Sequence, residues 1–234
     1  MRRLTLSIDA LTALREATAA EVDLSAAAAL AELAGVDSLR IGAIEAQAAA
    51  GLKDALEARR ATRRLELRMA PAQALLKVAL ETRPDRVLLA AEGRGRGPCA
   101  PLDLRSAASP LVSVARVLGE AGIPVSALIA PEADAVKAAH AAELASVDLY
   151  TAGIVDLPEP ARSEKRERLT DAVRLAAKLR LSVGLSGGLG FRTLPELLPA
   201  TPAVERVAVG RAISARALLV GLDRALRDLR ALIA

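Results

Sequence analysis

Short apolar runs and longer segments of helical period alternate along this chain of 234 residues, and the alternation repeats eight times. The runs are four to seven residues long and rich in Leu, Val and Ile, which is typical of β-strands. A strand followed by a helix, repeated, predicts parallel strands joined by helical crossovers. The expected strands are residues 4–8, 38–41, 64–69, 86–90, 124–130, 146–150, 181–185 and 206–210.

The segments between these runs are expected to be helices, because their apolar residues recur at three- and four-residue spacing, as in Leu222 and Leu226. Gly35 and Gly122 lie where two of these segments end, as C-terminal capping glycines do. Pro71 is expected to open a helix, a position where its missing N–H is harmless. The expected helices are residues 24–34, 52–60, 71–82, 111–120, 133–142, 163–179 and 215–233.

Eight strand–helix units in a chain of this length favour a closed (β/α)8 TIM barrel, which typically takes about 250 residues. A doubly wound open sheet is the structural alternative. No linker-like segment interrupts the pattern, so we expect one domain over residues 1–234. The longest non-periodic stretch, residues 91–109, is expected to be a loop over the active site.

Composition excludes several classes of protein. The net charge is +4 and the pI is near 9.7, but aromatic residues make up only 1% and the arginines are interspersed with acidic residues, so no nucleic-acid partner is expected. One cysteine, Cys99, excludes an internal disulfide. Asp9 and Arg15 interrupt the apolar start of the chain, and no apolar run reaches membrane-spanning length. We therefore expect a cytoplasmic protein without a membrane partner.

Glycines follow the seventh and eighth expected strands. The stretch "VGLSGGLGF" carries Ser186, Gly187 and Gly188 just after one strand, and Gly210 and Arg211 follow the next. In TIM barrels these two loops commonly bind phosphate through backbone N–H groups and a helix N-terminus. The glycine spacing fits neither a nucleotide P-loop nor a dinucleotide fingerprint. The alternative is that the glycines only permit tight turns.

Residues that exchange protons near neutral pH are scarce in this chain. The only histidine, His140, lies within an expected outer helix, and Cys99 has no histidine partner nearby in the sequence. No cluster with metal-ligand spacing is present, so neither a metal nor another cofactor is expected. The remaining candidates for acid–base work are Asp9, Glu45, Glu92, Asp103 and Tyr150.

Several polar residues lie where expected strands end, which is where TIM barrels carry their chemistry. Ser7, Asp9 and Arg15 follow the first strand, and Arg68 ends the third. We expect Asp9, Arg15 and Arg68 to share one pocket. Together with Arg211, these arginines would make that pocket attractive to an anionic ligand, namely a phosphorylated small molecule.

The order of several motifs resembles the pyridoxine 5′-phosphate synthase family. They are "SIDALTALREA", "RMAPAQALLKVALETRPDRVLLAAE", "LGEAGIPVSALI", "GLSGGLGF" and "VAVGRAISARAL", and they span nearly the whole chain. The resemblance implies a (β/α)8 barrel, commonly an octamer, that condenses deoxyxylulose 5-phosphate with aminoacetone phosphate. We accordingly expect a homo-oligomer, between a dimer and an octamer.

The resemblance also assigns roles to positions, and this chain departs from several of them, including three proton-transfer positions. Asp9 and Arg15 match the first motif of the family. Gly42 takes the place of a catalytic histidine, Arg68 that of a glutamate base, and Gly187 that of a histidine acid. We expect the neighbouring Glu66 to point to a different face of its strand and not to replace the base. Loss of all three groups implies that the ring-closing reaction is lost.

Three hypotheses about function follow. The first is a diverged enzyme acting on another phosphorylated molecule, with Asp9, Glu45 or Glu92 as acid or base. The second is a non-catalytic relative, either a sensor or a partner subunit of an active vitamin B6 synthase. The third is an active pyridoxine 5′-phosphate synthase that uses other residues.

Overall fold

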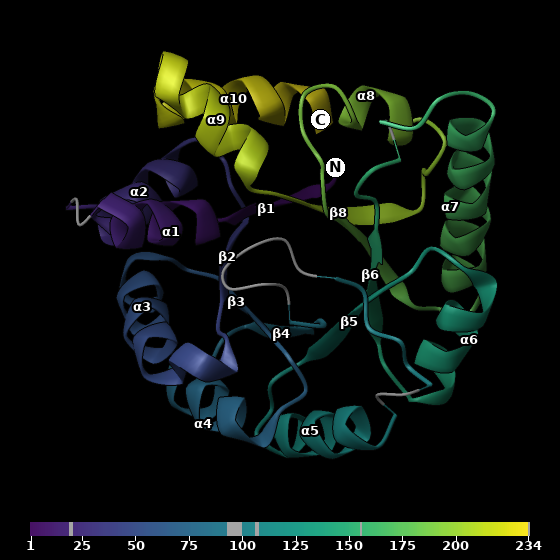
Figure 1. Ribbon diagram of the computed structural model, residues 1–234, viewed down its shortest axis with the longest axis horizontal. Helices are drawn as coiled ribbons and strands as arrows, with labels where there is room; N and C mark the ends of the chain where they lie inside the picture. The colour runs from purple at the N-terminus through teal and green to yellow at the C-terminus, as the bar shows by residue number, and fades with distance from the viewer. Residues whose placement is uncertain (19–20, 93–99, 106–107, 155, 234) are drawn as a thin grey trace.

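Eight parallel strands close into a barrel in chain order in the computed structural model, which describes residues 1–18, 21–92, 100–105, 108–154 and 156–233 (Figure 1). Every neighbouring pair is parallel, and β8 pairs with β1 to close the ring. This confirms the (β/α)8 barrel and excludes the open sheet. The strands are β1 (Arg3–Ser7), β2 (Ser38–Gly42), β3 (Leu65–Met69), β4 (Arg86–Leu89), β5 (Val125–Ile129), β6 (Ser146–Tyr150), β7 (Ser182–Ser186) and β8 (Val204–Val209).

Helices form a ring around the barrel (Figure 1). Gly35 and Gly122 lie just past two helix ends with positive φ, as expected of capping glycines. The helices are α1 (Asp9–Thr18), α2 (Leu24–Leu33), the 3-10 turn η1 (Glu45–Gln47), α3 (Ala48–Ala61), α4 (Gln73–Thr82), α5 (Ala108–Glu120), α6 (Ala133–Ala141), α7 (Ala161–Lys178), α8 (Leu194–Leu197), α9 (Arg211–Val220) and α10 (Leu222–Ile233).

Three helix predictions need correction. The single helix expected over residues 215–233 is two helices, α9 and α10, separated by Gly221 with φ of +81°. A residue in that conformation cannot continue a right-handed helix. Pro71 does not open a helix, because α4 begins at Gln73. Helices α1 and α8 were not predicted; α8 is a single short turn with little periodicity to detect.

The main hydrophobic core lies between the barrel and the helices. Leu39 and Ile41 on β2 and Leu65 and Leu67 on β3 are fully buried and belong to this core. These residues occupy every second strand position, so their side chains leave the sheet toward the helices. Leu and Ala predominate in the core because the chain has so few aromatic residues.

The inside of the barrel is different, because most of it is polar. Leu88, Ala90 and Leu128 form a small apolar cluster with Tyr150, separate from the main core. Charged side chains from the other strands fill the rest, as described below. A TIM barrel usually fills this space with branched apolar residues. The apolar pattern of the sequence therefore predicts the core between barrel and helices, and does not predict the charged side chains inside the barrel.

Among the described residues, no helix is long and apolar enough to cross a membrane. His140 is exposed in the last turn of α6, in agreement with the expected outer helix. Cys99 lies outside the described residues, as does part of the loop 91–109.

Candidate functional site

A pocket of about 580 Å³ opens where β1, β7 and β8 end and the loops after them begin. Its volume falls within the range of small-molecule sites, about 300–1,000 Å³. Asp156 and Tyr150 also face it. The predicted site residues that it brings together are Ser7, Asp9, Arg68, Ser186, Gly187, Gly188, Gly210 and Arg211.

The glycine turn after β7 requires glycine for two reasons. Gly187 and Gly188 have φ of +97° and +68°, a region that other residues rarely adopt. A Cβ atom on Gly187 would lie 2.7 Å from Cε2 of Tyr150, and one on Gly188 would lie 3.1 Å from the Cα atom of Ala152. The turn therefore brings bare backbone to the edge of the pocket.

The N-terminus of α9 forms the neighbouring edge. Gly210 precedes the helix, and a Cβ atom there would lie 3.0 Å from Cβ of Ser7. Arg211 is the first helical residue and is exposed at the pocket. The first N–H groups of a helix have no intrahelical partner, and this end of the helix dipole is positive. This edge thus has the electrostatics of an anion site.

Asp9 is the carboxylate held most firmly at the pocket. Its Oδ1 accepts a hydrogen bond from the backbone N–H of Gly42 at 2.6 Å. Its Oδ2 accepts one from the hydroxyl of Ser7 at 2.9 Å and lies 3.3 Å from Nη2 of Arg68. All three neighbours are donors, so Asp9 serves here as an acceptor fixed in position.

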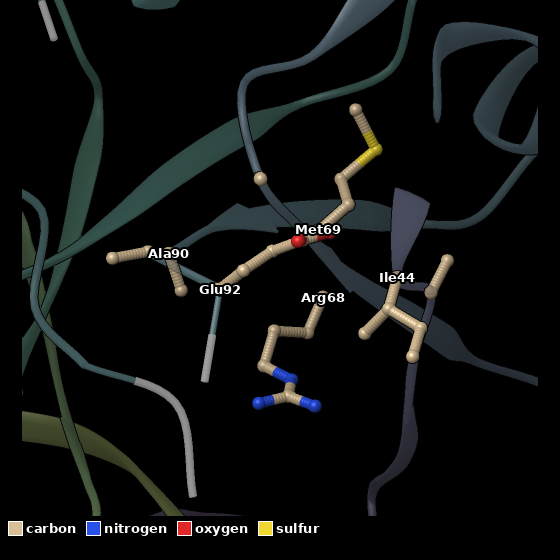
Figure 2. A pocket seen from close by; sticks show the side chains of 8 residues that line it. Ile44, Arg68, Met69, Ala90 and Glu92 are labelled. Carbon is tan, nitrogen blue, oxygen red and sulfur yellow. The ribbon is translucent and has the colours of Figure 1, made fainter. Parts of the chain in front are cut away.

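Arg68 reaches the pocket because Gly42 makes room for it. A Cβ atom on Gly42 would overlap Nη2 of Arg68, and the arginine is only 8% exposed. Arg68 also borders a second cavity, of about 10 Å³, with Met69 and Glu92 (Figure 2). That volume suits a single water molecule at most. In Figure 2 the guanidinium of Arg68 and the side chain of Glu92 extend in different directions.

Arg40 lies at the floor of the pocket and links three strands. It donates from Nη1 to Oγ of Ser186 at 2.8 Å and from Nη2 to Oδ2 of Asp148 at 2.7 Å, and its Nε donates to Glu66. The hydroxyl of Ser186 in turn donates to Oδ2 of Asp148 at 2.8 Å. The hydroxyl of Ser186 therefore belongs to a buried hydrogen-bond network and is not an exposed group at the rim of the pocket.

Two further arginines complete this network from below the floor. Arg86 pairs with Glu66 and lies 3.4 Å from Oδ1 of Asp148, and Arg206 lies 3.4 Å from the same Asp148 oxygen. A Cβ atom on Gly184 would overlap Oδ1 of Asp148, so β7 needs glycine there. Buried charges are tolerated only when they are paired and hydrogen-bonded, as they are here.

The network shifts the pKa values of its members. Burial alone would raise the pKa of Asp148, but attraction to Arg86, Arg40 and Arg206 holds that pKa far below its ordinary value. Burial opposes the charge of Arg40, yet Glu66 and Asp148 raise its pKa. Burial and repulsion from Arg86 lower the pKa of Arg206, which is the least compensated of the three arginines.

Four predicted candidates do not reach the main pocket. The prediction that Arg15 shares it with Asp9 and Arg68 is wrong, because Arg15 pairs with Asp54 and, at 3.2 Å, with Glu57 on α3. Those carboxylates lie on the neighbouring helix, so the guanidinium turns away from the barrel mouth. The others are exposed and outside the pocket: Glu45, Glu92 and Asp103. The backbone N–H of Glu45 donates to Oε1 of Glu92 at 2.7 Å.

The buried network was missed from the sequence. Its charges stand in the middle of short strands, at Arg40, Glu66, Asp148 and Arg206. Both faces of a barrel strand are buried, so a charge at such a position must point inward and find a partner. The expectation that Glu66 faces away from Arg68 was also wrong, because residues two apart on a strand share a face.

Comparison with known proteins identifies the family of this chain. Residues 4–234 match the family model described as pyridoxal phosphate biosynthesis protein PdxJ. A protein of Pelobacter propionicus named pyridoxine 5′-phosphate synthase is 31% identical, over 100% of this chain and 99% of its own. One of Solidesulfovibrio magneticus with the same name is 33% identical, over 100% of this chain and 98% of its own.

Solved structures support the fold. A 3-hexulose-6-phosphate synthase superposes with a TM-score of 0.63 at 18% identity, over 99% of this chain and all of the other. A 4-hydroxy-2-oxoglutarate aldolase superposes with a TM-score of 0.65 at 18% identity, over 100% of this chain and 94% of the other. These two likenesses concern the barrel alone. With the family model spanning the chain and relatives above 30% identity along its full length, this protein belongs to the PdxJ family.

Proposed function

We propose that this member of the PdxJ family binds a phosphorylated small molecule in the main pocket and does not carry out the ring-closing reaction of pyridoxine 5′-phosphate synthesis. The observation that carries the proposal is the composition of the pocket. It combines an edge suited to an anion, at Gly187, Gly188 and Arg211, with an arginine where the family resemblance assigns a base.

The phosphate would lie between the glycine turn and the start of α9. Bare backbone at Gly187 and Gly188, the positive helix end and the Arg211 guanidinium all favour a doubly charged oxyanion. The backbone N–H groups and the helix end do not depend on the three proton-transfer side chains that the resemblance assigns and this chain lacks. Phosphate binding is therefore the part of the family chemistry that we expect this chain to retain.

At two of the positions to which the family resemblance assigns proton-transfer groups, Gly42 and Gly187, neighbouring side chains occupy the space. Any side chain on Gly42 would overlap Arg68, and a Cβ atom on Gly187 would lie 2.7 Å from the ring of Tyr150. Arg68 itself stays protonated near neutral pH and cannot act as a base. These residues fit one another, and such a set supports a change of ligand more strongly than one substituted residue would.

Asp9 favours a second candidate function, an enzyme that acts on a different phosphorylated molecule. It is a carboxylate in the pocket with a fixed position, which an acid or base requires. The two candidates share ligand binding and differ in turnover. Asp9→Asn separates the two candidates. In an enzyme it would abolish turnover, whereas a protein that only binds its ligand would still bind it.

Calorimetric titration with inorganic phosphate and with glycerol 3-phosphate tests the phosphate site. We expect both to bind, and Arg211→Ala to weaken both. Arg174→Ala is the matched control, since Arg174 is an exposed arginine paired with Asp171 on α7. Absence of binding at millimolar concentration would leave the glycines as tight turns only.

The absence of the ring-closing reaction is tested by incubation with deoxyxylulose 5-phosphate and aminoacetone phosphate. The relative from Geobacter metallireducens, named pyridoxine 5′-phosphate synthase and 32% identical, is the positive control. We expect no pyridoxine 5′-phosphate by chromatography, and none from Gly187→His alone because Tyr150 blocks the imidazole. Product formed at the rate of the control would refute this part of the proposal.

A further inference from the structure

Arg68 places a positive charge deep in the pocket, away from the edge proposed for phosphate. It stands near the end of β3, whereas the phosphate edge lies after β7 and β8. The residue is 8% exposed, so its charge is shielded from bulk water. A charge in such surroundings acts more strongly on a bound ligand than a charge at the surface does.

Three arginines and two carboxylates line the pocket, and one of the arginines, Arg40, is already paired with Glu66 and Asp148. The other two are Arg68 and Arg211, and the carboxylates are Asp9 and Asp156. Asp156 lies 3.6 Å from Arg192, outside the pocket, and both oxygens of Asp9 already accept hydrogen bonds from the chain. A ligand therefore meets positive charge at two separate places, the phosphate edge and the floor.

We propose that the ligand of this pocket carries a second oxyanion, a carboxylate or a second phosphoryl group, and that Arg68 binds it. This inference rests on the proposed phosphate site. A guanidinium presents its N–H donors in a plane that matches two oxygens of such a group. It repels an ammonium group, so an amine-bearing phosphate such as aminoacetone phosphate fits this floor poorly.

Asp9 does not prevent this binding. One guanidinium can serve two carboxylates, as Arg40 does between Glu66 and Asp148. Asp9 also keeps its hydrogen bonds from Gly42 and Ser7 whatever Arg68 contacts. It thereby holds the arginine at the pocket while the ligand approaches the guanidinium.

The test compares 3-phosphoglycerate with glycerol 3-phosphate, which differ only in a carboxylate against a hydroxymethyl group. Tyr150 is the only tyrosine, the chain has no tryptophan, and the ring borders the pocket, so tyrosine emission reports occupancy alongside calorimetry. We expect 3-phosphoglycerate to bind about tenfold tighter or more, the factor for one charge-assisted interaction. Arg68→Met should abolish the preference for 3-phosphoglycerate over glycerol 3-phosphate, whereas Arg68→Lys should retain part of it.

Two further probes cover the length and kind of the second group. 2-Phosphoglycolate is a shorter phosphorylated acid, and propane-1,3-diol bisphosphate replaces the carboxylate with phosphate. Tighter binding of either than of glycerol 3-phosphate, lost in Arg68→Met, supports the proposal and identifies the group. If glycerol 3-phosphate binds and no probe with a second oxyanion binds tighter, or if the preference survives in Arg68→Met, the inference is overturned and the phosphate site stands. If no phosphorylated probe binds, the proposed function itself fails.

Discussion

Arg40 and Asp148 lie 108 residues apart in the chain and meet inside the barrel, where Nη2 of one is 2.7 Å from Oδ2 of the other. They come from β2 and β6, which are separated by three strands in either direction around the closed sheet. Their side chains are only 5% and 1% exposed. The pair therefore ties opposite walls of the barrel together directly beneath the pocket.

Neutralising Asp148 should destabilise the protein strongly. In Asp148→Asn, three arginines would face Glu66 as the remaining carboxylate of the network, and removing one partner of a buried ion pair costs about 3–5 kcal/mol. Urea unfolding measures the loss. The control is Asp171→Asn, whose side chain is 76% exposed and should change the free energy of unfolding by less than about 0.5 kcal/mol. Equal stability of Asp148→Asn and the wild type would contradict a stabilising network.

Asp148 should also affect how the free energy of unfolding changes at acid pH. The folded state holds the pKa of Asp148 far below its ordinary value of 3.8, so the unfolded chain binds the proton more readily. Its stabilising contribution is complete above that ordinary value and is lost progressively as the pH falls below it. Urea midpoints between pH 7 and pH 3 should therefore fall, and less so in Asp148→Asn. The same pH dependence in both proteins would show that other groups determine it.

A methyl group on Gly184 should destabilise the protein. Its Cβ atom would overlap Oδ1 of Asp148, and overpacking of a filled interior costs about 1–3 kcal/mol. Gly119→Ala is the contrasting control, because it lies in α5 with no atom within 4 Å of the added Cβ and gains helix propensity. Thermal unfolding should rank Gly184→Ala below, and Gly119→Ala at or above, the wild type. The opposite order would mean that β7 adjusts freely.

Association through the outer helices is also expected, with at least a dimer in solution. Leu218 and Leu219 on α9 are 82% and 85% exposed, an unusual placement for consecutive large apolar residues. Light scattering at micromolar concentration should show an oligomer. The double substitution Leu218→Lys and Leu219→Lys should reduce its mass, and Val112→Lys on α5 should not. A wild-type monomer would contradict this expectation.

Most of the fold followed from local pattern. Alternating apolar runs placed all eight strands to within about two residues, because each strand must bury an outward face against the helices. The break between α9 and α10 was missed because apolar periodicity continues through Gly221, and only its positive φ ends the helix. Periodicity detects which face is buried and does not detect a local change of backbone direction.

The site was predicted in part. The residues at strand ends, such as Asp9, Arg68 and Gly187, came together because parallel strands end at one rim. Arg15 did not join them, since its side-chain direction depends on carboxylates of another helix. The pairing of Arg40 with Asp148 joins strands far apart in the chain, which no short-range pattern reveals.

The filled space at Gly42 has an evolutionary consequence. A descendant that regained a side chain there would first have to move or shorten Arg68, and one that changed Arg68 first would leave Asp9 without its cation. The two positions are thus coupled, and a change at either one disturbs contacts on which the other depends. Under selection for a stable fold, the two positions would have to change together.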